Sequence, residues 1–419
     1  MELITKYQYT YFIKPFLIKE NKYDKYLLKL LQNKSCKLKM FEKERDLNIY
    51  THFLSNVREY FFPTFNYTKE KARELENMKN NATKAAILSK LSCNIFEYNL
   101  EKDLQGKINE KDGIFFNINK IEIVCFDTGL CFLVIKTTVE NSKYFSEMLD
   151  FNYKFKDINS EFYKLKAFNN IRIQTDKFGN IKEFSNFINE IIGFNDNFSD
   201  NKDMDIYNKR FFTYGYICID QNYWNETNSF EGLEDEFFKF NNVLSKNYNS
   251  STNSEDVEEG TEIVSKWEYA RFGFTKQSGS LFCSNIDITN YTNLLFEYEN
   301  EYLYTLIISL YQRIILKKIA SKLKSKKDIT ETIKNFTKFT KEAWFKELTN
   351  SEVGSLFYNN WRKVFELEEI YEEIKNKYDV IYKEIGISNG NKLNKAIIIA
   401  LLISVILNII NFIALFQKM

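Results

Sequence analysis

An uncharged apolar run near the C-terminus restricts this chain more than any other feature of its sequence. The run extends from Ala396 to Phe416 and reads AIIIALLISVILNIINFIALF. At about 1.5 Å per residue, a helix of this length spans about 31 Å, which is the thickness of one hydrocarbon core. A helix buried in a soluble core is a poor alternative, because this run has no charged face. The sequence therefore predicts one transmembrane helix, with the lipid bilayer as a partner.

The charges that flank this run indicate its orientation. Four lysines precede it closely and a single lysine follows it, at Lys377, Lys383, Lys392, Lys395 and Lys418. Positive residues concentrate on the cytoplasmic side of a span, so we expect a single-pass protein of the cell membrane with its long N-terminal part in the cytoplasm. The segment Tyr302 to Leu316 is also apolar, but it is short and contains Gln312 and Arg313, which predicts a buried helix.

The predicted span carries a polar stripe. Ser404, Asn408 and Asn411 follow one another at i, i+4 and i+7, which places them on one face of a helix. An asparagine that faces lipid is costly, so this face is expected to meet protein or water. Two hypotheses follow: the stripe joins helices of a homo-oligomer by hydrogen bonds, or it lines a pore.

Composition excludes several classes of function. Lys and Arg number 58 and Asp and Glu number 57, so direct binding of nucleic acid is not expected. The six cysteines have no C-x-x-C spacing and His52 is the single histidine, which disfavours structural zinc and histidine-based catalysis. Scattered cysteines and the absence of an apolar N-terminal signal fit a reducing cytoplasm. No nucleotide-binding or nucleophile motif is present, so we expect neither an enzyme nor a resident cofactor.

Residues 1–285 mix strand and helix signals, which predicts an α+β or α/β cytoplasmic domain. The clearest signal is a hairpin, in which Ile121–Phe126 and Leu130–Val139 flank a turn containing Gly129. The other predicted strands are Lys6–Ile18, Asn170–Gln174, Phe211–Asp220 and Trp267–Phe274. The predicted helices are Tyr23–Leu31, Lys69–Leu88, Ser142–Asn152 and Lys182–Ile192. An acidic stretch, Asn247–Glu262, predicts a surface loop.

Residues 286–390 are predicted to form a helical stalk region, and 391–419 the transmembrane segment and tail. An apolar seam with heptad spacing is formed by Val364, Leu367, Tyr371, Ile374, Tyr378, Ile381 and Ile385. This seam belongs either to an amphipathic helix packed on its own domain or to a stalk helix that packs against its copies in a coiled coil. Gly386 and Gly390 interrupt the helical pattern, which predicts a hinge before the membrane.

Two charged clusters have alternative explanations. The basic cluster contains Lys317, Lys318, Lys322 and Lys324 at the end of a predicted helix. It is either a solvated face or a patch for an anionic ligand or lipid headgroups. The acidic cluster Asp196, Asp200, Asp203 and Asp205 lacks the glycine and terminal glutamate of a calcium loop, so it predicts a solvated loop without metal.

The helical stretch Phe339 to Ile385, together with the span that follows, resembles the CorA-like divalent-cation transporter superfamily. The resemblance covers about a third of the chain. It implies a homo-oligomer, usually a pentamer, with a funnel of cytoplasmic domains above a central pore. The family has two spans joined by a Gly-Met-Asn loop, whereas this chain has one predicted span and no such tripeptide.

The resemblance therefore favours a shortened membrane effector of antiviral defence, of the kind found beside type III CRISPR systems, over a magnesium transporter. In that hypothesis a cytoplasmic domain senses a ligand, either a divalent cation or a nucleotide second messenger, and gates a small ion channel. The alternatives are a tail-anchored binding or scaffold protein without a pore, and a divalent-cation transporter.

Overall fold

The computed structural model describes residues 2–100, 104–108, 113–140, 142–156, 171–175, 179–193, 210–223, 230, 232–248, 260–324, 329–381 and 383. The chain divides into two compact units. The first contains 1–315 and 338–367, and the second contains 316–337 and the described residues from 368 onward. The predicted span 396–416, its stripe Ser404, Asn408 and Asn411, and the predicted hinge Gly386 to Gly390 lie outside the described residues.

The first unit is built on one twelve-stranded sheet. Its strands are β1 (Thr5–Leu17), β2 (Cys36–Leu38), β3 (Cys93–Tyr98), β4 (Leu104–Ile108), β5 (Ile114–Phe126), β6 (Leu130–Val139), β7 (Ile171–Thr175), β8 (Gly179–Glu183), β9 (Phe212–Ile219), β10 (Glu262–Trp267), β11 (Ala270–Phe274) and β12 (Ser278–Ser284). The order is β10-β11-β12-β9-β1-β6-β5-β4-β7-β8. In addition, β3 pairs with the half of β5 that does not pair with β4, and β2 pairs with β3. Only β12 and β9 pair in parallel among the described strands. The prediction of an α+β fold is confirmed, in the form of a large mixed sheet with helices.

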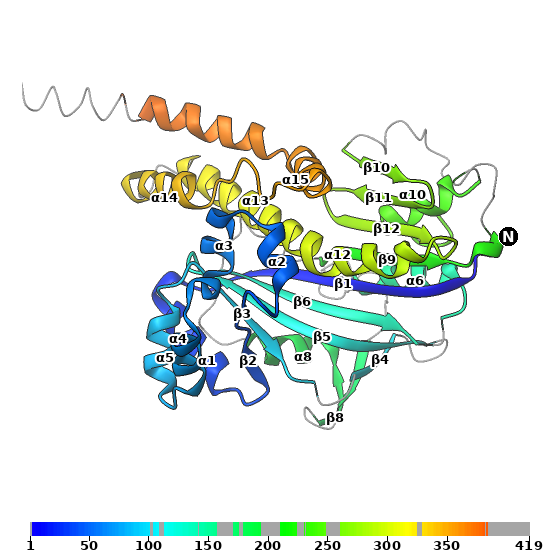
Figure 1. The fold of residues 1–419 in the computed structure, drawn as a ribbon, viewed down its shortest axis with the longest axis horizontal. Coiled ribbons are helices and arrows are strands. Elements are labelled where there is room, and N and C mark those ends of the chain that lie inside the picture. Colours follow the sequence, from blue (N-terminus) through cyan, green and yellow to red (C-terminus); the bar gives the residue numbers. More distant parts are fainter. Residues whose placement is uncertain are drawn as a thin grey trace, which may run out of the picture. The chain divides into compact units, whose positions relative to one another are not determined.

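Helices cover both faces of this sheet (Figure 1). On one face lie α1 (Tyr23–Gln32), α4 (Lys69–Asn77), α5 (Asn81–Leu88), α6 (Phe145–Phe155), α8 (Phe184–Ile192) and α10 (Glu234–Asn241). There Phe12 of β1 stacks on Phe155 of α6, with 4.0 Å between ring centroids. Successive residues of a strand point to opposite faces of the sheet. The residues next to Phe12 in β1 therefore face a second core on the other side of the sheet.

The opposite face carries α2 (Leu47–His52), α3 (Ser55–Phe61), α12 (Asn293–Glu297), the first half of α13 (Leu303–Lys324) and α15 (Glu352–Val364). Phe126 of β5 stacks on Tyr311 of α13 at 3.9 Å between ring centroids, and Tyr214 of β9 stacks on Tyr298 at 4.0 Å. A strand buried on both faces needs apolar side chains throughout, which explains the near-continuous apolar run of β6.

The predicted hairpin is confirmed as β5 and β6. Its turn requires Gly129, whose φ is +78°, a conformation that residues with a Cβ rarely adopt. A Cβ at this position would also lie 2.3 Å from the carbonyl oxygen of Ile18, and the Ile18 amide donates to the Gly129 carbonyl at 2.9 Å. The turn therefore closes the hairpin and fixes the end of β1 at once.

Two predicted elements need correction. The predicted helix Lys69–Leu88 is two helices, α4 and α5, because the Asn80 side chain accepts hydrogen bonds from the amides of Ala82 and Thr83 and so caps a new helix. The predicted strand Trp267–Phe274 is a tight hairpin, in which β10 ends at Trp267 and pairs directly with Ala270 of β11. The other predicted strands and helices occur as β1, β7, β9, α1, α6 and α8.

The apolar segment Tyr302 to Leu316 forms a buried part of α13, as predicted. Gln312 and Arg313 are 0% and 5% exposed. Gln312 donates to the Ala343 carbonyl at 2.9 Å, and the Arg313 guanidinium donates to the Lys276 carbonyl at 3.2 Å, so both side chains have hydrogen-bond partners within the protein. Within the described residues, no helix combines the length and apolar character needed to cross a bilayer.

In the second unit, the predicted apolar seam contacts a helix of the same chain. Phe336 of α14 (Ile329–Glu342) packs on Tyr371 and Tyr378, with 5.5 and 5.7 Å between ring centroids. The seam is also not one continuous helix, because α15 ends at Val364, Glu366 has a φ of +54° and helix resumes over 367–381. For these two tyrosines, the arrangement favours a helix packed on its own chain.

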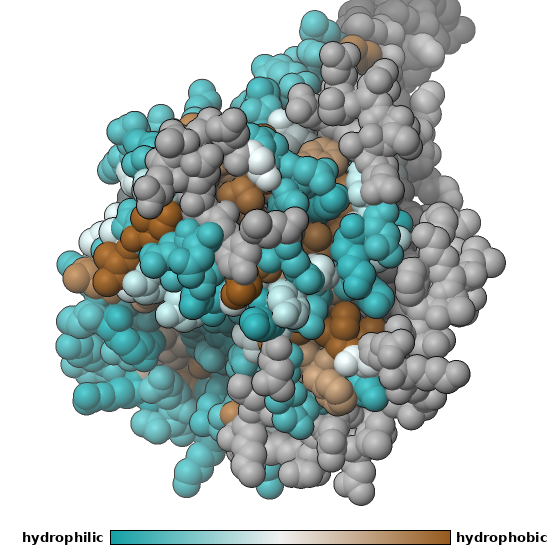
Figure 2. Space-filling model, turned by 90° about the vertical axis from the view of Figure 1, so that its right-hand side faces the viewer, coloured by the Kyte–Doolittle hydropathy of each residue, from teal (hydrophilic) through white to brown (hydrophobic). Residues whose placement is uncertain are grey.

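The surface of the described residues shows no single large apolar area in the view of Figure 2, where apolar groups are separated by hydrophilic side chains. Tyr7, which is half exposed, stacks on Tyr291 at 5.3 Å between ring centroids. Ile288 and Phe296 are also exposed. Such scattered apolar groups are ordinary on a protein surface and do not by themselves define a docking face.

Close packing at Gly279 provides a test of the fold. A Cβ at this position of β12 would lie 2.8 Å from Trp361 of α15, which is 1% exposed, and 3.0 Å from Tyr214. Neither ring can move away freely, so Gly279→Ala should lower the free energy of unfolding by about 1–3 kcal/mol. Chemical denaturation of the solubilised full-length protein, followed by circular dichroism, measures this loss. Ser265→Ala, at an exposed position of β10, should change it by less than about 0.5 kcal/mol.

Candidate ligand-binding site

A buried carboxylate lies at the centre of the site. Glu122 belongs to the apolar strand segment Ile121–Phe126 and is 1% exposed. Its Oε1 lies 2.8 Å from the Lys39 Nζ and 3.1 Å from the Lys120 Nζ. A buried charge is stable only when it is paired and hydrogen-bonded, and here two ammonium groups share one carboxylate.

Each lysine is positioned by the sheet. Lys39 follows β2, and its amide donates to the Ile95 carbonyl of β3 at 2.7 Å, which extends the strand pairing. Lys120 lies at an irregularity of β5, where the register with β6 shifts between Ile118 and Lys120. That shift turns Lys120 toward the face on which Glu122 lies.

The site also includes the first turn of α13. The Lys39 Nζ donates to the Tyr304 hydroxyl at 3.0 Å. Burial strongly raises the pKa of this hydroxyl, and the nearby Glu122 carboxylate raises it further, so Tyr304 stays protonated and neutral. The contact connects the sheet edge to a helix that continues over the 22 residues Leu303–Lys324.

The ion pairs fix the charge states of the group. Burial opposes ionisation of Glu122, but Lys39 and then Lys120 more than compensate and lower the pKa of this carboxyl to about 2. Burial likewise favours the neutral amine of each lysine, yet Glu122 raises the pKa of both Lys39 and Lys120 above the ordinary value. Both lysines are therefore cationic at neutral pH, which makes them anchors for an anion and not amine nucleophiles.

A second ion pair lies beside the Glu122 group, on the neighbouring strand. Lys136 of β6 is the register partner of Lys120 and pairs with Glu299. Glu299 also accepts a hydrogen bond from the Tyr11 hydroxyl at 3.3 Å. Like charges that face each other across strands repel, so two separate carboxylates, Glu122 and Glu299, are needed to hold Lys120 and Lys136 side by side.

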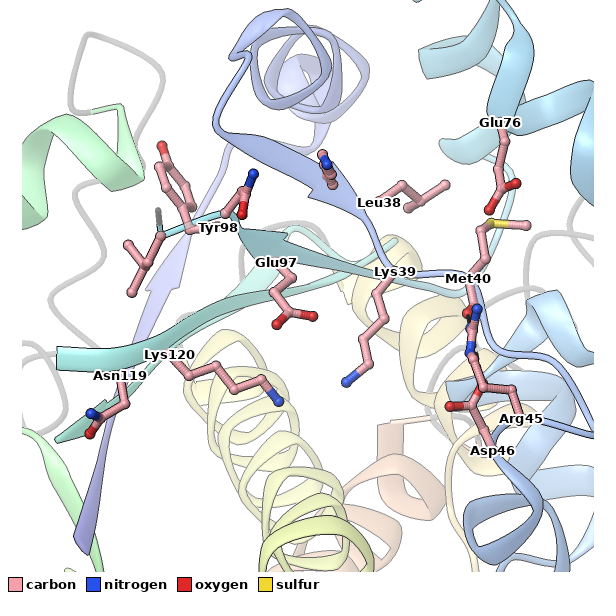
Figure 3. Close-up of a pocket in the computed structure, with 13 residues that line it drawn as sticks. Leu38, Lys39, Met40, Arg45, Asp46, Glu76, Glu97, Tyr98, Asn119 and Lys120 are labelled. Atoms are coloured by element: carbon pink, nitrogen blue, oxygen red, sulfur yellow. Dashed lines mark hydrogen bonds and ion pairs between the residues drawn. The ribbon is translucent and has the colours of Figure 1, made fainter. Parts of the chain in front are cut away.

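A cavity of about 440 Å³ opens beside the Glu122 group. Its lining residues are Lys37, Leu38, Lys39, Met40, Arg45, Asp46, Glu76, Glu97, Tyr98, Asn99, Leu100, Asn119 and Lys120. Figure 3 shows the side chains of Glu97, Lys39 and Lys120 directed into the same space from neighbouring strands. On the opposite wall, Arg45 pairs with Asp46 at 3.0 Å. The volume suits a small molecule.

The cavity has hydrogen-bond donors to spare. An ammonium group has three N–H donors. Lys39 uses two of them, toward Glu122 and Tyr304, and Lys120 uses one, toward Glu122. The remaining donors can bind the oxygens of a carboxylate or a phosphate without breaking the internal pairs. Among the described residues, no group of three or more His, Cys, Asp or Glu side chains could hold a metal ion.

The residues predicted from the sequence are not the ones that line this cavity. Lys317, Lys318 and Lys322 lie on α13 within the second unit and are half-buried. The side chain of Lys324 lies outside the described residues, as do Ser404, Asn408, Asn411, Gly386 and Gly390. The acidic cluster Asp196, Asp200, Asp203 and Asp205 also lies outside them.

Sequence reasoning missed the cavity because its residues come from separate segments. Lys39, Glu97 and Lys120 lie far apart in the sequence, and none of them belongs to a recognisable motif. Glu122 does carry a signal, since it is the only charged residue of the segment Ile121–Phe126 in the strongest predicted hairpin. A lone charge within such a buried run requires a counter-charge from elsewhere in the fold.

Comparisons of the chain with protein-family models, with curated proteins and with solved structures find no match.

The Glu122 group gives a pH-dependent test. Because the pKa of Glu122 is lowered from 4.5 to about 2 on folding, its contribution to stability is present above pH 4.5 and is lost as the pH falls toward 2. The shift corresponds to about 3 kcal/mol. Glu122→Gln should therefore destabilise the protein by about that amount at pH 7, and the difference from the original protein should disappear near pH 2.

Denaturant titrations of the full-length protein at several pH values measure this difference. Glu372→Gln is the matched control, because Glu372 forms an exposed pair with Lys375 at 3.1 Å, and exposed pairs contribute less than about 1 kcal/mol. A Glu122→Gln protein as stable as the original at pH 7 would contradict the role assigned to the buried carboxylate.

Proposed function

We propose that this chain is a membrane-anchored sensor that binds a small oxyanion-bearing ligand in the Glu97–Lys39–Lys120 cavity. The observation that carries the proposal is the hydrogen bond from Lys39 to Tyr304, because it joins the cavity to α13. An oxyanion bound to the spare donor of Lys39 would share the charge of the same ammonium group and so weaken its hydrogen bond to Tyr304. Binding would therefore change the contact between the sheet and the first turn of this helix.

The continuity of α13 supports a role in transmission. Tyr304 is its second residue, and the helix runs without interruption to Lys324, so that it begins in the first unit and ends in the second. A packed helix moves as a rigid element and not by gradual deformation. In this proposal the second unit is the part of the molecule that responds to the ligand.

The membrane part of the proposal rests on the sequence. The run 396–416 anchors the protein in the cell membrane, and Ser404, Asn408 and Asn411 join copies of the helix or line a pore between them. The segment from Gly386 to Gly390 would provide the hinge. In its full form, this is a CorA-like homo-oligomeric channel or effector, which suits a role in antiviral defence better than magnesium transport because the Gly-Met-Asn loop is missing.

One observation favours a second candidate, a tail-anchored binding protein without a pore. Tyr371 and Tyr378 of the predicted stalk seam pack on Phe336 of the same chain. Both rings are partly covered within their own chain, which leaves less of the seam to contact copies of the protein. Self-association would then depend mainly on the membrane segment.

The number of copies in the membrane distinguishes the two candidates. Native mass spectrometry of the solubilised full-length protein should give a closed ring, and Asn408→Leu combined with Asn411→Leu should reduce it to smaller species, because the interhelical hydrogen bonds are lost. The control pair Ile406→Leu and Ile409→Leu lies off the stripe and should leave the mass unchanged. A monomer or dimer for the original protein cannot enclose a pore with one span per chain, and would leave the tail-anchored binding protein.

Anion binding at the cavity is tested with inorganic phosphate as the probe. Lys120→Gln removes one anchor but leaves Glu122 paired with Lys39, so phosphate should bind about 10-fold more weakly, the loss expected for one charged hydrogen bond. Isothermal titration of the full-length protein at constant ionic strength measures the affinity. Lys90→Gln, an exposed position outside the cavity lining, should bind phosphate like the original protein. Equal affinities for all three proteins would place phosphate elsewhere.

A further inference from the structure

The cavity contains a carboxylate that the ion pairs do not use. Glu97 of β3 lines the cavity and is half-buried. In the strand register it stands directly opposite Glu122 on one side and Lys37 on the other. Among the described residues, none forms an ion pair with Glu97, since Lys39 and Lys120 are both bound to Glu122.

We propose that the cavity is built for a zwitterionic small molecule, which carries an oxyanion and an ammonium group. This inference rests on the proposed function and adds the class of ligand. The oxyanion binds the spare donors of Lys39 and Lys120, and the ammonium group binds Glu97. The three side chains already point into one space (Figure 3).

The charge of the cavity supports this class over a purely anionic ligand. Four cationic side chains line it, namely Lys37, Lys39, Arg45 and Lys120. Three carboxylates line it as well, Asp46, Glu76 and Glu97, and Glu122 lies directly beside it. The formal charges therefore balance without a ligand. A zwitterion keeps this balance, whereas an anion alone would leave Glu97 close to a second negative charge.

The register explains why Glu97 is suited to a cation. Two carboxylates directly opposite each other on neighbouring strands repel. Glu122 is compensated by two lysines at 2.8 and 3.1 Å, but no cation lies equally close to Glu97 among the described residues. A ligand ammonium group would supply the missing partner through a charge-assisted hydrogen bond.

The cavity volume limits the ligand to a small molecule. About 440 Å³ lies at the lower end of the range typical of ligand pockets. The apolar side chains of Leu38, Met40 and Leu100 also line the cavity, so the two charged ends of the ligand can be joined by a short hydrocarbon chain.

Matched pairs of compounds test the inference on the solubilised full-length protein. Each pair differs only in the ammonium group: glycine and acetate, β-alanine and propionate, 4-aminobutyrate and butyrate, phosphoethanolamine and ethyl phosphate. Isothermal titration at constant ionic strength gives the affinities. In at least one pair the amino compound should bind about 10-fold more tightly, as expected for one added charged hydrogen bond.

The variant Glu97→Gln should remove this preference without weakening the deaminated partner, which should bind equally well or more tightly because a repelling carboxylate is gone. Glu97→Asp, which keeps the carboxylate, should retain part of the preference. Glu347→Gln, at an exposed position outside the cavity lining, should behave like the original protein. Thermal unfolding without ligand checks that each variant is folded.

Different results would overturn the zwitterion inference and the anion-binding proposal. If both members of every pair bind equally through Lys120, the zwitterion inference is overturned and the anion-binding proposal stands. If Glu97→Gln keeps the preference for the amino compound, Glu97 is not its partner and the inference is again overturned. If no compound binds, and phosphate does not bind either, both proposals fail.

Discussion

The pairing of one buried carboxylate with two lysines ties together the elements on which the site depends. Glu122 of β5 forms ion pairs with Lys39, which follows β2, and with Lys120 of its own strand. Lys39 also reaches Tyr304 of α13. Removing Glu122 would leave two ammonium groups without their carboxylate, which costs more than the intact group contributes. The group therefore acts as a positional constraint: the sheet edge and the helix must meet in one register for every charge to be satisfied.

The same constraint prepares the cavity for a ligand. Lysine side chains are flexible, and holding them in one place normally costs conformational entropy. In the folded protein, contacts with Glu122 and Tyr304 already hold these side chains in place. Lys39 and Lys120 therefore point into the cavity before a ligand binds (Figure 3). Preorganised donors bind more tightly than mobile ones. Stability and recognition thus share the same atoms, and a ligand bound to Lys39 acts directly on the contact with α13.

The sequence predicted those elements that local pattern determines, and it failed where distant segments meet. The turn at Gly129 and the apolar runs beside it were sufficient for the β5–β6 hairpin. Capping by Asn80, which splits the predicted helix Lys69–Leu88, depends on a single side chain and was overlooked. The parallel pairing of β12 with β9 and the sharing of β5 between β3 and β4 leave no periodic signal. The cavity follows from that sharing, so it could not be predicted either.

If the chain assembles as proposed, the packing of Tyr371 and Tyr378 on Phe336 leaves the predicted membrane segment as the main site of association. An a/d seam drives association only when it lacks a partner in its own chain. In lipid, apolar side chains give little preference for another helix over the hydrocarbon around them, whereas amide side chains do. In the proposed assembly, the stripe of Ser404, Asn408 and Asn411 is therefore the feature of the sequence best suited to bring copies together. Asparagine is costly in lipid and inexpensive beside another polar group, so in the proposed span the stripe would favour an assembled state whether or not that state encloses a pore.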